Sequence, residues 1–565
     1  MGRLGYVVAI CLAVLVSCGK VDFEKIETGK PYTGLYGGRK CVVMIDSAEA
    51  GNMKGRIYLD NGEAVADPIP FTSELKKSGK GKLWIQGQKK SIVGIAIEGD
   101  TLKGELDKEA FTLSLYQEPE LPYRSQYVEP YYDVAVKQNV VYKKDVKGYW
   151  SSYPDTGDTF VNIYLGRAGE LTSKDKLKLE MDIYSPKGKP KGELCPLLIL
   201  IHGGAFYNGD KQDLGFPEMG RHFAKRGYVV ASINYRLGFM LMAADVDRAG
   251  YRALQDTHAA VCYLIGKAKD YNIDTNKIYA AGASAGAITA LNLAFMRDED
   301  RPKSTKAGGI LGWLSSTLLK DLEIDSDLGP INAVSSPHSH PFEVKAVINM
   351  WGAVNKIDML RNSRRTAILS FHGDADRIVP IAYGYPFDKV LESYVDTLIN
   401  GLPKLIRPVA EMGRDLYKKG KPFNEWAFNP VYGSSEIHNK AKSLGMRSEL
   451  HTVEGGKHSL QKDEQKALSS YFNDTILPTA TRFLCRETVG GKMVRLVQIG
   501  SWVNALDADN VAELRWQVKG GAVIGKDDKK VKVLFFGDAP KHSVIAGGKY
   551  KNGIEFRETI QEGRK

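Results

Sequence analysis

A serine between two glycines is the residue of this sequence best placed for chemistry. Ser284 stands in a Gly-Ala-Ser-Ala-Gly pentapeptide at residues 282–286, between an apolar run and the helix-favouring residues 287–296. A sharp strand-to-helix turn exposes the hydroxyl of such a serine, and the two glycines leave room for the backbone to cross. The first N–H groups of the following helix lack partners within it and can stabilise a developing anion. The segment therefore predicts the nucleophile of an acyl-transfer reaction.

A glycine-rich segment upstream is suited to supply the hydrogen-bond donors of that reaction. His202-Gly-Gly-Ala-Phe206 directly follows the apolar run 197–201. A tetrahedral intermediate needs backbone N–H groups aimed at its oxyanion, and glycine after a strand end lets the backbone approach a substrate closely. An ordinary glycine-rich turn between a strand and a helix has the same composition, so this segment alone leaves both interpretations open.

Two later segments offer a carboxylate and an imidazole. Residues 372–380 read His-Gly-Asp-Ala-Asp-Arg-Ile-Val-Pro and contain Asp374 and Asp376, while residues 455–458 read Gly-Gly-Lys-His and end on His458. Each follows a strand-like run. The carboxyl ends of the strands are where an open α/β sheet builds its site. We therefore expect the serine, one aspartate and the histidine to meet at one sheet edge.

These four segments, in this order, resemble those of the α/β-hydrolase superfamily. The likeness covers about Gly148 to Arg486 and is closest to the esterase, carboxylesterase and lipase group, with its H-G-G-x-[FW], G-x-S-x-G, H-G-x-x-D-x-x-V-P and late G-x-x-H motifs. It implies a carboxylic-ester hydrolase with Ser284 as nucleophile, Asp376 as acid and His458 as base. It also implies that the oxyanion is held by the backbone N–H groups of Gly204, Ala205 and Ala285.

The same resemblance assigns supporting parts to neighbouring residues. Asp376 is preferred to Asp374 because two residues separate it from the Val-Pro pair, as in the family's motif. His202, His372 and Asp374 are then expected to fix loop geometry, and Asp256 to pack near the sheet. No cofactor or metal is implied; the His-Ser-His segment at 338–340 has no carboxylate partner at ligand spacing.

The elements that position these segments follow from the hydrophobic pattern. Between about residues 146 and 486, continuous apolar runs alternate with helical stretches, which predicts an α/β domain with a mostly parallel sheet covered on both faces. An insertion at about 385–440 carries apolar side chains at helical spacing. It fits either surface helices or a cap over the site. A second insertion, at about 297–340, suits the lining of an acyl or alcohol pocket.

Two β modules are predicted at the ends of the chain. Residues 18–145 alternate short apolar runs with turn signals such as Asn61-Gly62, which favours a small all-β barrel or sandwich. Strand-like runs return in residues 487–565 and predict a second β module. Neither shows residues suited to catalysis, so spacer and glycan-binding roles both stay open.

Residues 1–17 predict a signal peptide of the lipoprotein type. The apolar run of residues 4–16 is too short to span a bilayer, and the Leu-Val-Ser-Cys segment ending at Cys18 resembles a bacterial lipobox. That resemblance implies lipidation of Cys18 and a place in the bacterial cell envelope. The protein would be anchored to the outer membrane, on its periplasmic or surface face. A plain signal peptide with an incidental cysteine is the alternative.

Composition narrows the function further. The 565 residues carry 78 Lys+Arg against 67 Asp+Glu, and 43 % are hydrophobic, which excludes a wholly disordered chain. The charge of +11 is spread along the chain, so no nucleic-acid partner is expected. The sequence favours a serine esterase acting on a small-molecule or glycan-linked ester, such as an acetyl or feruloyl ester. A prolyl-oligopeptidase-type peptidase and an inactive hydrolase-fold surface protein are the alternatives.

Overall fold

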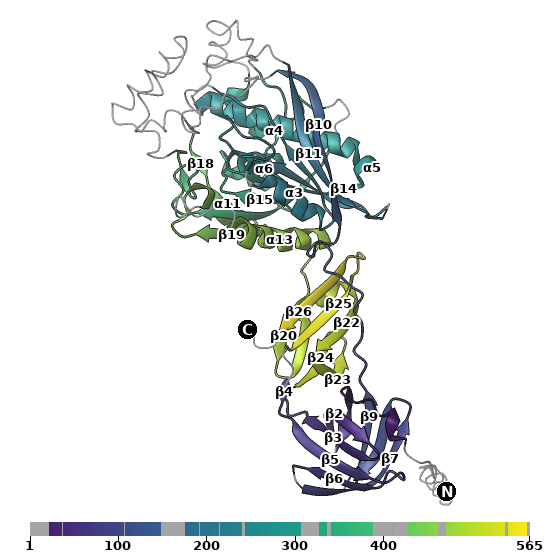
Figure 1. Ribbon diagram of the computed structural model, residues 1–565. Coiled ribbons are helices and arrows are strands. Elements are labelled where there is room, and N and C mark those ends of the chain that lie inside the picture. Colours follow the sequence, from purple (N-terminus) through teal and green to yellow (C-terminus); the bar gives the residue numbers. More distant parts are fainter. Residues whose placement is uncertain are drawn as a thin grey trace, which may run out of the picture. The chain divides into compact units, whose positions relative to one another are not determined.

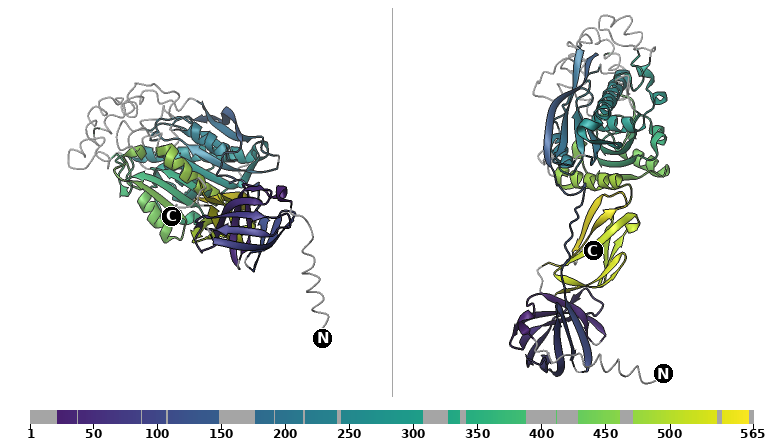
Figure 2. Two further views of the ribbon diagram at one scale, coloured as in Figure 1. Left: turned by 60° about the horizontal axis from the view of Figure 1, so that its bottom comes forward. Right: turned by 90° about the vertical axis from the view of Figure 1, so that its right-hand side faces the viewer.

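The computed structural model divides the chain into two compact units (Figures 1 and 2). Unit 1 joins residues 1–126 to residues 491–565, and unit 2 comprises residues 127–490. The structure describes residues 22–36, 38–86, 88–106, 108–147, 176–190, 192–213, 215–239, 243–306, 327–335, 341–387, 411, 428–460, 471–536 and 541–561. Cys18 with the predicted signal peptide, and most of both predicted insertions, lie outside these residues.

Unit 2 is built on an eight-stranded sheet in the order β10-β11-β13-β12-β14-β15-β16-β19. Every neighbouring pair from β13 to β19 is parallel, and only β11 runs antiparallel to its neighbours. The strands are β10 (Asp133–Lys147), β11 (Lys176–Lys187), β12 (Cys195–Ile201), β13 (Val229–Ile233), β14 (Ile273–Ala283), β15 (Val344–Met350), β16 (Ala367–Gly373) and β19 (Ser448–Val453). The sheet is therefore mostly parallel, as the sequence predicts.

Helices cover both faces of this sheet. α3 (Phe216–Ala224) and α13 (Leu477–Val489) contact each other on one face, while α4 (Ala243–Gly266) packs with α6 (Ala285–Phe295) on the other. The right-hand view of Figure 2 shows α4 running alongside the strands. Every residue of β12, β13 and β16 is buried. Strands covered on both faces need continuous apolar runs, which explains why the sequence pattern identifies them.

The boundary between the first β module and the α/β unit differs from the sequence prediction. The sequence predicts residues 133–145 at the end of the N-terminal module, but they belong to β10, which pairs antiparallel with β11. Side chains along residues 133–137 alternate between exposed and half-buried. This alternation is typical of an antiparallel edge strand and looks the same in a small β module. The pattern alone therefore places the boundary too late, and unit 2 begins at Tyr127.

Unit 1 begins with a closed antiparallel barrel, in which β1 pairs with both β2 and β9. Its strands are β1 (Pro31–Tyr36), β2 (Arg39–Glu49), β3 (Asn52–Leu59), β5 (Ile69–Leu75), β6 (Gly81–Ile85), β7 (Gln88–Glu98), β8 (Thr101–Leu106) and β9 (Glu109–Leu115). Closure pairs every strand on both sides and so removes the exposed sheet edges that would otherwise invite aggregation. Of the two architectures left open by the sequence, the structure adopts the barrel.

The C-terminal strands of unit 1 form two antiparallel sheets, β20-β21-β24-β23 and β22-β25-β26. They are β20 (Arg495–Ile499), β21 (Trp502–Leu506), β22 (Val511–Lys519), β23 (Gly521–Asp527), β24 (Lys530–Phe536), β25 (Ser543–Tyr550) and β26 (Glu555–Gln561). The short β4 (Val65–Ala66), between two barrel strands, pairs in parallel with β24. The two ends of the chain thus form one compact unit rather than two separate modules, a long-range pairing that no local pattern reveals.

Two partly buried histidines predict how the stability of unit 2 depends on pH. Burial, with nearby Arg226 and Lys225, lowers the pKa of His222 to about 3, and burial lowers that of His258 to about 4. Both rings are neutral in the folded state and bond hydroxyls, of Thr481 and Ser335 respectively. Unfolding returns each pKa to about 6.5, so the unfolded chain binds more protons below that pH. The stability contributed by each histidine is present above pH 6.5 and is lost as the pH falls towards 4.

Urea unfolding at pH 7 and pH 5 tests this expectation. The unfolding free energy should fall by about 1–2 kcal/mol per histidine between these pH values. His222→Gln keeps a hydrogen-bonding group but does not titrate. Between pH 7 and pH 5 its unfolding free energy should therefore fall less than that of the wild type, by the contribution of one histidine. An equal loss in the wild type and the variant would contradict a neutral His222.

Within the described residues, no helix is both long and apolar enough to cross a membrane.

Candidate active site

The turn between β14 and α6 holds Ser284 in an unusual backbone conformation. Its φ is +54° and its ψ is −119°, values that L-residues adopt only under constraint. A side chain at Gly282 would lie 2.2 Å from the carbonyl oxygen of Gly286, and one at Gly286 would lie 2.0 Å from that of Ile201. Only glycine fits at these two places. The Gly-x-Ser-x-Gly pattern is therefore the steric requirement of this turn, as the sequence analysis expects.

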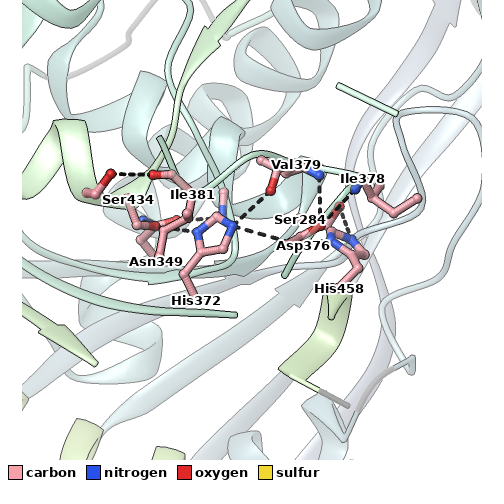
Figure 3. A network of polar contacts seen from close by, with 11 residues as sticks. Ser284, Asn349, His372, Asp376, Ile378, Val379, Ile381, Ser434 and His458 are labelled. Carbon is pink, nitrogen blue, oxygen red and sulfur yellow. Dashed lines mark hydrogen bonds and ion pairs between the residues drawn. The ribbon is translucent and has the colours of Figure 1, made fainter. Parts of the chain in front are cut away.

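Ser284, His458 and Asp376 form one chain of hydrogen bonds (Figure 3). His458 Nε2 lies 3.0 Å from Ser284 Oγ, and His458 Nδ1 lies 2.8 Å from Asp376 Oδ2. The carboxylate can only accept, so Nδ1 carries the ring proton and Nε2 presents a lone pair to the serine hydroxyl. This tautomer is the one a general base needs. The structure thus brings together the three residues that the sequence predicts from segments up to 174 positions apart.

The carboxylate of Asp376 is held in its ionised form. Burial alone would raise its pKa, but the hydrogen bonds from His372 and His458 hold the pKa well below its ordinary value. Its other oxygen, Oδ1, accepts the backbone N–H groups of Ile378 at 2.8 Å and Val379 at 3.0 Å. Four donors therefore surround a side chain with no exposed surface. A fixed negative charge at this place stabilises the imidazolium that forms when His458 takes a proton.

A polar network behind Asp376 fixes His372. Its Nε2 lies 3.0 Å from the carbonyl oxygen of Val379 and 3.3 Å from Asp376 Oδ2, so Nε2 carries the proton (Figure 3). Its Nδ1 then accepts from Ser434 Oγ at 2.7 Å, and Ser434 accepts in turn from the side chain of Asn349 at 3.0 Å. His372, Ser434 and Asn349 are completely buried. A geometric role for His372 is predicted from the sequence, but nothing in the sequence points to Ser434 and Asn349.

Removal of the His372 ring should weaken both the fold and the activity. In His372→Ala, Asp376 loses a donor and Ser434 loses an acceptor inside a dry core. We expect the free energy of unfolding to fall by about 1–3 kcal/mol. We also expect kcat to fall more than KM changes, because the carboxylate loses its orientation but the substrate pocket is intact. His438→Ala is the matched control. That ring also bonds a serine, Ser448 at 3.0 Å, but it lies far from Asp376 in the sequence and is not part of the hydrogen-bond network around that carboxylate. Equal effects of both substitutions on kcat would contradict a positioning role.

The loop after β12 lies next to the nucleophile. A side chain at Gly203 would lie 3.4 Å from the Cβ atom of Ser284. Gly204, Ala205 and Phe206 follow with φ values of +96°, +53° and +62°, so the backbone turns in the left-handed region for three residues. Gly204 closes this turn by accepting the N–H groups of Tyr207 and Asn208 through its carbonyl oxygen. Such a turn directs successive N–H groups to one side, which suits the binding of an anion.

Ala285 contributes to the same region as the first residue of α6, where a backbone N–H has no acceptor within the helix. Ala205 and Ala285 line one cavity together with Ser284. Two of the three residues predicted to donate to the oxyanion therefore line the cavity beside the nucleophile, and Gly204 precedes Ala205 in the glycine-rich turn.

His202 anchors that turn and takes no part in the hydrogen-bond chain. It is completely buried, its ring stacks on Tyr235 with centroids 4.3 Å apart, and its Nδ1 lies 2.8 Å from the carbonyl oxygen of Gly203. Burial lowers the pKa of His202, so the ring is neutral. The Tyr235 hydroxyl donates to the carbonyl oxygens of His202 and Gly203. These contacts fix the backbone from which the glycine-rich turn starts.

The remaining predicted residues have structural partners. Asp374 Oδ1 accepts the N–H of Gly455 at 2.7 Å, so it braces the loop that carries His458. Asp256, with no exposed surface, pairs with Arg236 at 2.9 Å, as expected of a residue that packs near the sheet. Trp351, which the sequence analysis does not single out, packs edge-on against His458 with ring centroids 6.4 Å apart.

A cavity of about 110 Å³ opens beside Ser284. Ile288 and Asn292 line it from successive turns of α6, and Val246, Asp247 and Tyr251 line it from α4. Phe387 and Phe428, whose rings stack 4.9 Å apart, form another part of its wall. Its surface is therefore mostly apolar with a few polar groups, the composition of a site for a small organic ligand. Phe387 and Phe428 both fall within the insertion that the sequence predicts at about 385–440.

Two polar features mark the far side of this cavity. Asn292 Oδ1 is buried and has no hydrogen-bond partner among the described residues. Burial raises the pKa of Asp247 to about 6, and its carboxylate accepts from Asn429 at 2.8 Å. Among the described residues there is no cluster of three or more metal-ligating side chains.

Comparison with known proteins relates part of unit 2 to esterases. Residues 181–370 match BD-FAE, a family of α/β-hydrolase-like domains. The chain is 31 % identical over 141 residues to gut esterase 1 of Caenorhabditis elegans and 32 % identical over 119 residues to the bile salt-activated lipase of Mus musculus. These matches cover 24 % and 20 % of this chain. The chain spans only 25 % and 20 % of those curated relatives.

Among solved structures, a truncated carbohydrate esterase from gut microbiota is similar over 66 % of this chain and 99 % of its own, with 16 % identity and a TM-score of 0.35. The BD-FAE match contains the glycine-rich turn and Ser284 and ends before Asp376 and His458. Over the segment that carries the candidate nucleophile, the chain is thus similar to esterases of the α/β-hydrolase fold.

Proposed function

We propose that this protein is a serine carboxylic-ester hydrolase in which Ser284, His458 and Asp376 are the catalytic residues. The observation that carries the proposal is the hydrogen-bond chain from Ser284 Oγ through His458 to Asp376, with the imidazole in the tautomer of a general base. The similarity of residues 181–370 to BD-FAE and the esterase relatives support the same reaction class.

The reaction follows from the protons at these atoms. As Ser284 Oγ attacks the ester carbonyl, its proton passes to His458 Nε2, and Asp376 stabilises the resulting imidazolium. The N–H groups of Gly204, Ala205 and Ala285 stabilise the oxyanion, and loss of one such donor typically costs about 10²–10³ in rate. His458 then protonates the departing alcohol. Water attacks the acyl-enzyme by the same route and releases the acid.

The cavity beside Ser284 supports a small acyl or aryl-acyl group as the substrate. Phe387 and Phe428 supply aromatic walls, and Asn292, which lines the cavity from α6, has a buried side-chain oxygen with no hydrogen-bond partner among the described residues. This combination suits esters whose acyl group is apolar near the carbonyl and carries a hydroxyl at its far end. A feruloyl ester on a polysaccharide fits this description, and an acetyl ester would occupy only the part of the cavity beside the carbonyl.

We further propose that Cys18 carries a lipid anchor and that the protein acts in the bacterial cell envelope, at the outer membrane. The support is the sequence alone: a basic start, a short apolar run and a lipobox-like Leu-Val-Ser-Cys segment. Metabolic labelling of the full chain with an alkyne fatty acid tests it. Incorporation that disappears in Cys18→Ser is expected, and unchanged incorporation would contradict it.

A substrate panel tests the proposed reaction. We expect hydrolysis of p-nitrophenyl acetate and of methyl ferulate, and no hydrolysis of dipeptide amides that contain proline. Peptide cleavage without ester cleavage would instead indicate a prolyl-oligopeptidase-type peptidase. Absence of both activities in folded protein would favour a catalytically inactive surface protein.

A further inference from the structure

The closed barrel of unit 1 contains an internal cavity that is separate from the catalytic site. The cavity measures about 80 Å³, close to the 110 Å³ of the cavity beside Ser284. The lining side chains are the inward-facing residues of the barrel strands, among them Val43 on β2 and Leu83 on β6. Small eight-stranded barrels either fill their interior with side chains or retain room for one small ligand. The barrel of this chain belongs to the second kind.

The chemistry of the cavity restricts its occupant. Its surface is apolar throughout. Burial raises the pKa of the Cys41 thiol, which lines the cavity, to about 11. A sugar, a phosphate or an ordered water would find no hydrogen-bond partner there, and a buried polar group without a partner is costly. The occupant must therefore be hydrocarbon in the part that enters the barrel.

The shape of the cavity favours a chain rather than a ring system. The lining residues extend from Cys41 to Ile45 along β2 and from Leu102 to Leu106 along β8. Four residues of strand cover about 13 Å. The volume corresponds to about five to eight water-sized positions. A space that is this long and this small in volume is narrow, and an extended aliphatic chain matches it.

We propose that the N-terminal barrel binds one aliphatic chain, with about five to eight carbons inside the cavity and any polar end group outside it. The proposal uses no residue of the Ser284 site and does not depend on the proposed esterase function. It gives the barrel a ligand-binding role in place of the spacer or glycan-contact roles left open by the sequence.

Displacement of a fluorescent apolar probe tests the proposal. The full chain with Ser284→Ala is loaded with N-phenyl-1-naphthylamine and titrated with linear alcohols of four to twelve carbons. Each methylene that enters the cavity should tighten binding about fourfold. The gain in affinity with each added carbon should stop at about eight carbons, which we call the chain-length limit. Wild-type protein whose catalytic serine has reacted with a fluorophosphonate should bind the probe equally well, which separates the barrel from the cavity beside Ser284.

Two interior variants should shift the chain-length limit in opposite directions. Val43→Phe fills the cavity and should move the limit to shorter alcohols, with at least tenfold weaker binding of octanol. Leu83→Ala enlarges the cavity and should move the limit to longer ones. Thr72→Phe, on an exposed position of β5, is the matched control and should change neither. Thermal unfolding confirms that each variant is folded.

Three outcomes would overturn the proposal. Absence of displacement by every alcohol would mean that the cavity is a packing void. Affinity that rises without limit to twelve carbons would indicate partitioning onto an exposed surface. A limit that stays at the same length in both folded interior variants would place the binding site elsewhere.

Discussion

Replacement of Ser284 by alanine is expected to lower kcat/KM for p-nitrophenyl acetate by about 10⁴- to 10⁶-fold. The hydroxyl oxygen is the atom that forms the acyl-enzyme. Among the described residues, it is the side-chain atom that is hydrogen-bonded to His458 Nε2. The fold should be unaffected because the backbone of the turn, with φ of +54°, is available to alanine at the same cost as to serine. The activity that remains should come only from substrate binding and from stabilisation of the oxyanion.

Initial rates with purified variant, together with its circular dichroism spectrum, measure this effect. Ser435→Ala is the matched control, since that hydroxyl bonds only the carbonyl oxygen of Ile381 among the described residues. It should retain activity within about threefold of the wild type. Turnover by a folded Ser284→Ala protein within tenfold of the wild type would mean that the nucleophile is another group.

Replacement of Asp376 by asparagine is expected to lower kcat by about 10⁴-fold. Asparagine keeps the shape but can offer an N–H to His458, which favours the tautomer with the proton on Nε2. That tautomer cannot accept the proton of Ser284. Asp374→Asn is the control, because Asp374 bonds a backbone N–H and no histidine. It should cost less than tenfold, and equal losses in both variants would contradict the assignment of Asp376.

The same substitution should also change how stability depends on pH. The pKa of Asp376 is depressed in the folded protein, so its stabilising contribution is present above the unfolded-state value of about 3.9. It is lost as the pH falls below that value towards the folded-state pKa. The difference in unfolding free energy between wild type and Asp376→Asn should therefore be largest near neutral pH and shrink below pH 4. Chemical unfolding at pH 7 and pH 3 measures it.

The sequence identifies the three residues of the hydrogen-bond chain because each stands in a local motif with a local cause. Gly282 and Gly286 are required by backbone contacts of about 2 Å, so the turn around Ser284 is visible in five residues. Asp376 is placed by its spacing from the Val-Pro pair, and His458 by the glycines that precede it. The buried strands are visible because both faces are covered, which demands continuous apolar runs.

What the sequence misses depends on contacts between distant segments. Ser434 and Asn349 are common residue types, and only their meeting with His372 in a buried network gives them a part in the site. The pairing of β4 with β24 joins residues 470 positions apart, so no local pattern indicates that the two chain ends share one unit. The apolar cavity in the barrel is likewise a property of how β1 closes on β9.

Covalent labelling tests the central claim most directly. Incubation of the folded full chain with a fluorophosphonate, followed by intact-mass measurement and peptide mapping, should give one adduct, located on Ser284. Labelling should be abolished in Ser284→Ala and slowed by more than about 10²-fold in His458→Ala, because the base that activates the hydroxyl is gone. Folded wild-type protein that stays unlabelled, or an adduct on another residue, would contradict Ser284 as an activated nucleophile.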